Sequence, residues 1–208
     1  FQVDPVLIGR CTNSSYKDLT KAASIFKNNK IHSDVDVAIS PGSSKVLKML
    51  ANNGALATFI DAGARILECS CGPCIGMGQS PKNNAVSLRT YNRNFCGRSG
   101  THTAKVYLVS PETAAISAIK GYISDPATLG ENIVIDEPIS YPDSDGYFLY
   151  NKDFNASIIM GPNIKPFPVN KELEESLTGK ILLKAGDNIT TDDIVPSHAK
   201  LLPYRSNI

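Results

Sequence analysis

Short apolar runs separated by amphipathic stretches dominate residues 1–125 of this chain. Apolar runs bounded by glycine, proline and polar residues predict buried strands, whereas apolar residues spaced three and four apart predict helices. Strands are expected over 6–8, 35–39, 65–68 and 106–109. Helices are expected over about 15–28, directly after the turn at 40–43, over 55–62 and over 111–119.

The order of these elements predicts the fold class. Strands alternating with helices are typical of a mostly parallel sheet covered on both faces, so residues 1–125 are expected to form a three-layer α/β/α domain. In such sheets ligands gather at the carboxyl ends of the strands. Cys11 and the loop over 69–80 each follow a predicted strand, so we expect them to meet there. Residues 83–100 form a polar stretch to which no strand is assigned.

The pattern changes after residue 124. Prolines recur from Pro126 to Pro168 and hydrophobic periodicity is weak, so residues 126–180 are interpreted as a Pro-rich linker that wraps over a surface. A new strand is expected over 180–184, and residues 181–208 are interpreted as the start of a second, truncated domain. The chain begins without Met in an apolar run and stops without a tail-like composition, so we interpret it as a piece of something larger.

Composition narrows the classes of function. The chain has 21 Lys and Arg against 20 Asp and Glu, a net charge of +1, so no basic field favours nucleic acid as a partner. No apolar run approaches the roughly 18 residues of a membrane span, and the N-terminus lacks the pattern of a signal peptide. Five cysteines, an odd number, are typical of a reducing compartment, so a cytoplasmic protein is expected.

Three cysteines carry the strongest chemical signal. Cys11 lies in a Gly-Arg-Cys-Thr-Asn run, and Cys71 and Cys74 form a Cys-Gly-Pro-Cys motif. Three thiolates suit a soft metal centre with one corner left open to substrate. The motif alone also fits a redox dithiol, half a zinc site or two core residues. Cys69 extends it, so a four-thiolate zinc site with Cys11 is an alternative.

Two arginines and a pair of acids are further candidates. Arg93 and Arg98, set among amides and a glycine, suit a bidentate grip on carboxylates, although surface arginines are more often only solvated. The turn over 40–43 could bind an anion at a helix N-terminus, or could serve only as a cap. Asp192 and Asp193 could point a carboxylate toward a cleft, or could be solvated in a turn.

Seven motifs, in this order along the chain, resemble those of the aconitase family. They are Gly9-Arg10-Cys11-Thr12-Asn13-Ser14-Ser15 with the following Tyr16-Lys17-Asp18-Leu19, Pro41-Gly42-Ser43, Cys71-Gly72-Pro73-Cys74-Ile75-Gly76, Tyr91-Asn92-Arg93-Asn94-Phe95, Gly97-Arg98, Leu108-Val109-Ser110-Pro111-Glu112 and Asp187-Asn188-Ile189-Thr190-Thr191-Asp192. The resemblance implies that residues 1–125 are the third, cluster-bearing domain of a compact bacterial-type aconitase. Residues 181–208 would begin its swivelling fourth domain.

The same resemblance implies the chemistry. Cys11, Cys71 and Cys74 would hold a [4Fe-4S] cluster whose fourth iron binds the hydroxyl and carboxylate of a tricarboxylate substrate. Substrate would be bound by Arg93, Arg98, Asn92 and Arg205, and Asp192 would be a catalytic residue contributed by the fourth domain. The reaction would be the reversible conversion of citrate to isocitrate through cis-aconitate, in the tricarboxylic acid cycle.

Departures from the family pattern and missing parts bear on this interpretation. Asp193 stands where the family usually has His, His198 replaces a small residue, and Cys69 and Cys96 are additional. The family's acid–base groups from other domains are absent from these 208 residues, so the piece alone is expected to be inactive. Its partners would be the missing domains of the same chain.

Other functions remain open from the sequence. Homoaconitase and isopropylmalate isomerase are alternatives within the superfamily. The Cys-Gly-Pro-Cys motif is closer to aconitase, and a linker that runs on into a swivel domain disfavours a split-subunit isopropylmalate isomerase. A non-catalytic metal-binding module that uses Cys69, or an RNA-binding module, is a different kind of alternative. The near-zero net charge counts against the RNA-binding module.

Overall fold

The computed structural model describes residues 1–130, 133–143, 146, 148–166 and 168–195, without the side chain of residue 192. Its contacts divide the chain into two units, of which the second is Asp145–Ile194. The first unit contains the whole sheet and all the helices that pack on it. Among the described residues, no helix combines the length and apolar character needed to cross a membrane.

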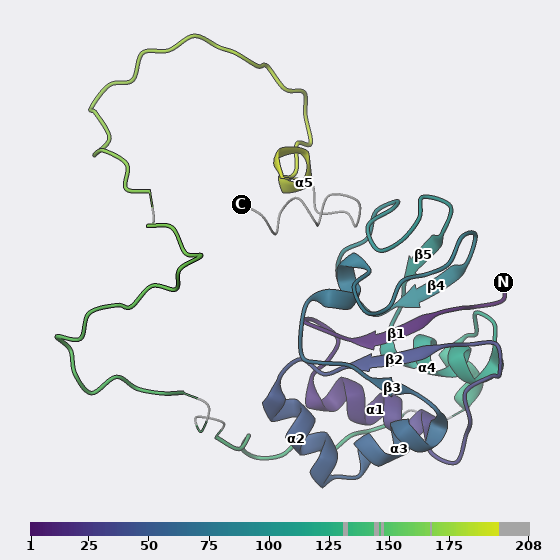
Figure 1. Ribbon diagram of the computed structural model, residues 1–208. Helices are drawn as coiled ribbons and strands as arrows, with labels where there is room; N and C mark the ends of the chain where they lie inside the picture. Colours follow the sequence, from purple (N-terminus) through teal and green to yellow (C-terminus); the bar gives the residue numbers. More distant parts are fainter. Residues whose placement is uncertain (131–132, 144–145, 147, 167, 196–208) are drawn as a thin grey trace. The chain divides into compact units, whose positions relative to one another are not determined.

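A five-stranded parallel sheet forms the centre of the first unit (Figure 1). Its strands are β1 (Val6–Gly9), β2 (Val37–Ser40), β3 (Arg65–Ile66), β4 (Val86–Arg89) and β5 (Lys105–Leu108). They lie in the order β3-β2-β1-β4-β5, and every neighbouring pair is parallel. The strand order therefore reverses between β1 and β4, which is where parallel sheets of this kind open a crevice for ligands.

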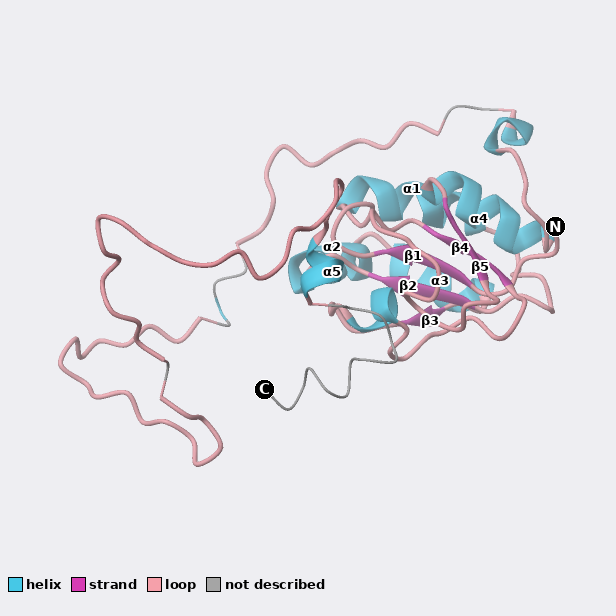
Figure 2. Ribbon diagram, turned by 90° about the horizontal axis from the view of Figure 1, so that it is seen from above, coloured by secondary structure: helices cyan, strands magenta, loops and turns pink. Residues whose placement is uncertain are grey.

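Helices cover one face of this sheet. They are α1 (Tyr16–Phe26), α2 (Ser44–Asn52), α3 (Ala55–Ala62) and α4 (Pro111–Lys120), and Figure 2 shows α1 and α4 along the same side of the strands. Val6 on β1 pairs with Val37 and Leu88, and all three belong to the main core, which the helices complete with Leu19 and Phe59. Alternate strand positions thus point to the helices, as the period of two requires.

Local sequence signals fix where the helices begin. Ser15 caps α1 by accepting a hydrogen bond from the Asp18 amide, and the Asp18 carboxylate accepts one from the Ser15 amide, a reciprocal capping box. Ser43 and Ser110 cap α2 and α4 in the same way through a single hydroxyl. These caps hold α1 and α2 directly behind the loops that follow β1 and β2.

The opposite face is covered by the segment that joins β3 to β4. That segment must run back across β2 and β1, and a right-handed crossover in this direction lies on the face away from α1. It contains the 3-10 helix η1 (Gly72–Ile75). On this face Leu7, Ala38, Cys74 and Tyr91 form a second, smaller buried cluster with Leu67 packed against it. The cysteine motif is therefore placed on the sheet by the order of the strands.

The expected α/β fold with covering layers on both faces of a parallel sheet is confirmed. The predicted helices form, with α3 at the expected limits and α1 shorter than expected by a few residues. One strand was missed: β4 lies in the polar stretch over 83–100. Its polar residues Ser87 and Arg89 are buried, and their hydrophilic character conceals the strand in the sequence.

The second unit has little regular structure among its described residues. Its helix is α5 (Thr191–Ile194), and every residue of this unit whose side chain is described is exposed, except Gly161. The strand expected over 180–184 is wrong, since no strand forms there. Ile181, Leu182 and Leu183 are all more than four-fifths exposed, so no neighbouring strand or apolar face supports pairing. The limits of the linker and of the second domain stay predictions.

Candidate functional site

The carboxyl ends of β1 and β4 are joined by the side chain of Thr90. The Thr90 hydroxyl accepts a hydrogen bond from the Gly9 amide at 2.8 Å and donates one to the Gly9 carbonyl at 3.2 Å. The Asn13 side-chain amide donates to the Thr90 carbonyl. These contacts link residues about eighty positions apart in the sequence, and they bring the loop that carries Cys11 beside the loop that carries Asn92.

Cys11 follows a backbone turn that only a few residue types adopt readily. Gly9 has a φ of +116° and Arg10 a φ of +75°, and the Arg10 amide donates to the Ser40 carbonyl at 2.7 Å. A Cβ on Gly9 would lie 2.1 Å from the Ser40 carbonyl oxygen, so glycine is required there. This turn presents the Cys11 Sγ to the Asn92 Oδ1, 3.9 Å away.

A small pocket of about 100 Å³ lies where the loops after β1, β2 and β3 meet. Cys11 lines it from the first loop, Ser40 and Gly42 from the second, and Cys69 and Cys71 from the third. Burial, and then the neighbouring Glu68, raise the pKa of the Cys69 thiol. The expectation that Cys11 and the cysteine loop meet at the carboxyl ends of the strands is thus confirmed.

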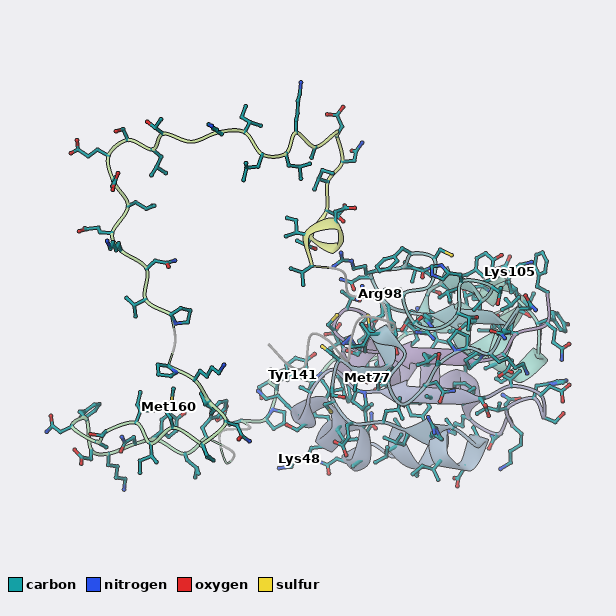
Figure 3. All side chains as sticks on the ribbon, turned by 45° about the horizontal axis from the view of Figure 1, so that its top comes forward. Lys48, Met77, Arg98, Lys105, Tyr141 and Met160 are labelled. Atoms are coloured by element: carbon teal, nitrogen blue, oxygen red, sulfur yellow. The ribbon has the colours of Figure 1, made fainter. Side chains whose placement is uncertain are left out.

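Cys74 and Cys71 differ in their exposure to solvent. The turn of η1 leaves Cys71 exposed and buries Cys74 to 7% exposure. Gly76 then adopts a φ of +83°, and a Cβ there would lie 2.9 Å from the Ser99 carbonyl oxygen. The cysteine loop and the loop over 95–99 consequently pack backbone to backbone. Figure 3 shows Met77 and Arg98, one from each loop, at the end of the sheet away from Lys105, the first residue of β5.

Arginine side chains surround the buried thiol. The Arg98 Nη2 donates to the Cys74 Sγ at 3.2 Å, and the Arg98 guanidinium lies 5.4 Å from the centre of the Phe95 ring. The Arg89 Nη1 donates to the carbonyl of Pro73, inside the Cys-Gly-Pro-Cys turn, at 2.9 Å. Burial lowers the pKa of Arg89, but a guanidinium stays charged in a protein. Positive charge is therefore buried around the cysteine motif.

Tyr91 lies among these groups. Its ring centre is 5.7 Å from the guanidinium carbons of both Arg10 and Arg89. Burial raises the pKa of its phenol, and the Cys74 and Cys11 thiols act in the same direction against the two arginines. The phenol is therefore a neutral O–H at physiological pH, able to donate a hydrogen bond toward the thiols.

The residues present fit an anionic, sulfur-bound group. Among the described residues, no three His, Cys, Asp or Glu side chains are close enough to hold a single metal ion. An iron–sulfur cluster spaces its thiolate ligands more widely than one ion does. Neither Arg10 nor Arg89 has a carboxylate partner within the described ranges, so a negatively charged cluster would complete the charge balance. Cys11, Cys71 and Cys74 as its ligands stay a prediction.

The other predicted site residues are placed as follows. Asn92 and Arg93 are exposed and follow the carboxyl end of β4, and Asn92 contacts Cys11, whereas Arg98 is buried against Cys74. Asp192 lies in α5 of the second unit, and Arg205 lies outside the described residues. The Asp193 carboxylate accepts hydrogen bonds from the Thr190 amide and hydroxyl, which lower its pKa. The substrate and catalytic roles of these residues stay predictions.

Sequence interpretation missed three residues of the site, namely Arg10, Arg89 and Tyr91. Arg10 directly precedes Cys11, Tyr91 directly precedes Asn92, and Arg89 lies three positions before Asn92. The available signal was the run Val86-Ser-Leu-Arg, which alternates between apolar and polar residues as a strand does. Because both alternating sets are buried here, the strand is central, and an arginine on a central strand indicates a buried polar site.

Comparison with known proteins gives consistent matches. The family model described as "Aconitase family (aconitate hydratase)" matches residues 1–121. The 3-isopropylmalate dehydratase large subunit 2 of Archaeoglobus fulgidus is 42% identical over 126 residues, 60% of this chain and 30% of the relative. The methanogen homoaconitase large subunit of Methanocaldococcus jannaschii is 42% identical over 125 residues, again 60% and 30%.

A longer match extends past the sheet. The mitochondrial homoaconitase of Candida albicans is 37% identical over 191 residues, which cover 89% of this chain and 27% of the relative. The chain therefore spans less than a third of the length of these relatives. Their names correspond to the alternatives drawn from the sequence, and the preference for citrate and the tricarboxylic acid cycle receives no support from them.

Proposed function

This chain belongs to the aconitase family, and from that premise we propose that it is the cluster-carrying part of a hydro-lyase that moves a hydroxyl group between neighbouring carbons of a hydroxy-polycarboxylate. The observation that carries the proposal is the meeting of Cys11 and Cys71 at one pocket, with Cys74 held against buried arginine. A bound [4Fe-4S] cluster would supply a Lewis acid at an iron without a protein ligand.

The chain's own residues would hold and orient the substrate around that centre. Arg93 is exposed and directly follows Asn92, and its planar guanidinium can grip a carboxylate with two parallel hydrogen bonds. Asn92 is held near Cys11, so its amide can bind a substrate oxygen close to the cluster. Arg98, in contact with the Cys74 thiol, would support the cluster ligand, and Arg205 and Asp192 would complete the site from the second domain.

Homocitrate is the substrate we propose first, followed by isopropylmalate and then citrate. The homoaconitase of Candida albicans matches 89% of this chain, so its similarity continues beyond the sheet into the segment after residue 130. The isopropylmalate dehydratase large subunits match over 126–130 residues. Similarity over both segments favours a single-chain enzyme of the homoaconitase type over a large subunit that pairs with a separate small one.

The proposal also includes a compartment and further partners. All five cysteines are free thiols, which supports a reducing compartment such as the cytoplasm. The acid–base groups that the reaction needs would come from further domains of the same protein. Such groups typically contribute about 10²–10⁴-fold to the rate, so the 208-residue chain alone should not interconvert any of the three substrates.

The test is a comparison of substrates on anaerobically reconstituted protein. The protein is purified both as this chain and in the longer form, iron and sulfide are measured, and absorption spectra are recorded. Dehydration is then followed with homocitrate, isopropylmalate and citrate. We expect cluster in both forms, activity in the longer form alone, and the highest catalytic efficiency with homocitrate. Absence of iron and sulfide from both forms would contradict the proposal.

A further inference from the structure

Arg89 and Tyr91 form a buried layer beneath the Cys-Gly-Pro-Cys turn. Arg89 ends β4 and is 2% exposed, and Tyr91 follows two residues later at 4%. The register pairs Arg89 with Leu7 on β1, so both lie on the face that carries the cysteine segment. One guanidinium N–H of Arg89 reaches the Pro73 carbonyl directly above, and the phenol ring lies against the guanidinium.

This layer contains polar atoms that the described residues do not satisfy. The Arg89 Nη2 and the Tyr91 hydroxyl are buried and have no hydrogen-bond partner in this part of the chain. Leaving such a donor unsatisfied destabilises the folded protein, and the effect is larger for a charged group. Two unsatisfied donors on adjacent side chains of one layer indicate a missing acceptor that both can reach.

The chemistry of the surroundings indicates what that acceptor is. Tyr91 packs with Cys74 in the smaller buried cluster, and both Cys74 and Cys11 are close enough to influence its phenol. The guanidiniums of Arg10 and Arg89 flank the ring, so the acceptor meets positive charge on two sides. An acceptor beside two thiols and two guanidiniums is anionic and sulfur-rich. A substrate carboxylate would instead meet the exposed Arg93 first.

We propose that Arg89 and Tyr91 are positioning residues for the iron–sulfur cluster, donating hydrogen bonds from the Arg89 Nη2 and the Tyr91 hydroxyl to its thiolate and sulfide sulfurs. Arg89 also fixes Cys74, because it holds the carbonyl of the residue before it. The inference rests on the proposed function, since it requires a cluster at this site. Hydrogen bonds to sulfur and nearby positive charge stabilise the more negative, reduced cluster and so raise its reduction potential.

Four variants of the protein test this role. Tyr91→Phe removes the hydroxyl and keeps the ring between the guanidiniums, and Tyr107→Phe is its matched control, because Tyr107 lies on β5 at 41% exposure. Arg89→Met removes both the charge and the donors, whereas Arg89→Lys keeps a charge and one set of donors. Each variant is reconstituted anaerobically. The measurements are iron and sulfide content, the midpoint potential followed by electron paramagnetic resonance, and the rate of iron release to a chelator.

The expected results distinguish hydrogen bonding of Arg89 and Tyr91 to the cluster from a role in packing alone. Tyr91→Phe should retain the cluster with a more negative midpoint potential than wild type, and Tyr107→Phe should not shift it. A lost hydrogen bond to a charged acceptor corresponds to about ten- to a hundredfold, so iron release from Arg89→Met should accelerate by that factor. Arg89→Lys should restore part of the difference. Thermal unfolding of the cluster-free proteins shows whether Arg89→Met still folds.

Two failures are distinguishable. If wild-type protein binds no iron and sulfide, the proposed function is wrong, and the positioning role of Arg89 and Tyr91 is wrong as well. If wild-type protein binds the cluster but Tyr91→Phe and Arg89→Met leave both the potential and the iron release unchanged, the positioning role is wrong. In that case the unsatisfied donors are met by buried water, and the cluster is held by its thiolates alone.

Discussion

Apolar side chains of the helices cover one face of the sheet, whereas on the other face a loop covers buried charged side chains. On the helix face, Val6, Val37 and Leu88 pack against apolar helix residues such as Phe59. On the cysteine face, the same strands present Leu7 and Ala38 beside Arg89, under a segment whose one regular element is a 3-10 turn. Among the described residues, the helix face is covered by apolar side chains. On the cysteine face, the buried Arg89 Nη2 and Tyr91 hydroxyl have no hydrogen-bond partner in that part of the chain. The difference separates the surface that stabilises the fold from the surface that awaits a ligand.

The largest effect should come from a cavity on the helix face. Phe59 is fully buried and meets Phe26 edge to face at 5.9 Å. Phe59→Ala should therefore lower the free energy of unfolding by about 3–5 kcal/mol in a urea titration. Phe154→Ala is the control, because Phe154 is 97% exposed, and it should leave the transition unchanged. Equal losses in the two variants would contradict the assignment of the core.

A second prediction concerns the turn that leads from the sheet to Cys11. Gly9→Ala forces a left-handed conformation on a residue with a Cβ, at a cost of about 1–3 kcal/mol, and pushes that Cβ onto the Ser40 carbonyl. Gly54 also has a positive φ, +82°, but a Cβ added there meets nothing within 4 Å, so Gly54→Ala is the control. Urea titrations should show a clearly larger loss for Gly9→Ala. A loss no greater than that of Gly54→Ala would show that the turn can relax.

The third prediction addresses substrate at the cysteine face. In the longer form of the proposed hydro-lyase, Arg93→Lys replaces a two-pronged guanidinium with an ammonium that cannot copy its geometry. A charge-assisted hydrogen bond contributes about 1.5–3 kcal/mol, so catalytic efficiency should fall about ten- to a hundredfold. Iron and sulfide content, measured on the same preparations, should stay at the wild-type value. Wild-type efficiency with an intact cluster would place Arg93 outside the site.

The smallest effect is a pH dependence on the helix face. Burial raises the pKa of Glu112, but hydrogen bonds from Lys21 and its own backbone outweigh that, and its pKa is lowered. A lowered pKa gives stability that is present above the ordinary carboxyl range and is lost as pH falls through it. Glu112→Gln should therefore cost about 1 kcal/mol at neutral pH and almost nothing at about pH 3.

The exposed ion pair of Lys17 and Glu137 is the matched control for the Lys21–Glu112 pair. Glu137 bridges Lys17 at 2.9 Å, but both side chains are about half exposed, so water screens them. Glu137→Gln should change the urea midpoint much less at either pH. If the two glutamate variants behave alike, the partly buried position of the Lys21–Glu112 pair between α1 and α4 has no energetic consequence.

The two faces also differ in how far the sequence predicts them. Apolar periodicity identified α1 through Leu19 and Phe26, and apolar runs identified β1 and β2, because burial of hydrocarbon leaves a direct pattern. The strand-end positions of Cys11 and Cys71 followed from the same pattern. β4 was missed because Ser87 and Arg89 are polar and yet buried. The burial of Cys74 and the orientation of Tyr91 depend on contacts between distant loops, which no local pattern encodes.

The seam between β1 and β4 has a consequence for the time course of folding. β1, β2 and β3 follow one another with their helices between them, whereas β4 must return across about eighty residues to pair with β1. Distant pairings form late, because the entropy of the intervening loop is lost before any contact compensates for it. In a pulsed hydrogen-exchange experiment on refolding protein, we expect the amides of β2 to gain protection before those of β4. Protection of β4 first would contradict this order. Arg89 and Tyr91 would then be apart from the thiols of Cys11 and Cys74 in every early intermediate, so a metal captured before β4 pairs would meet the thiols without these two donors.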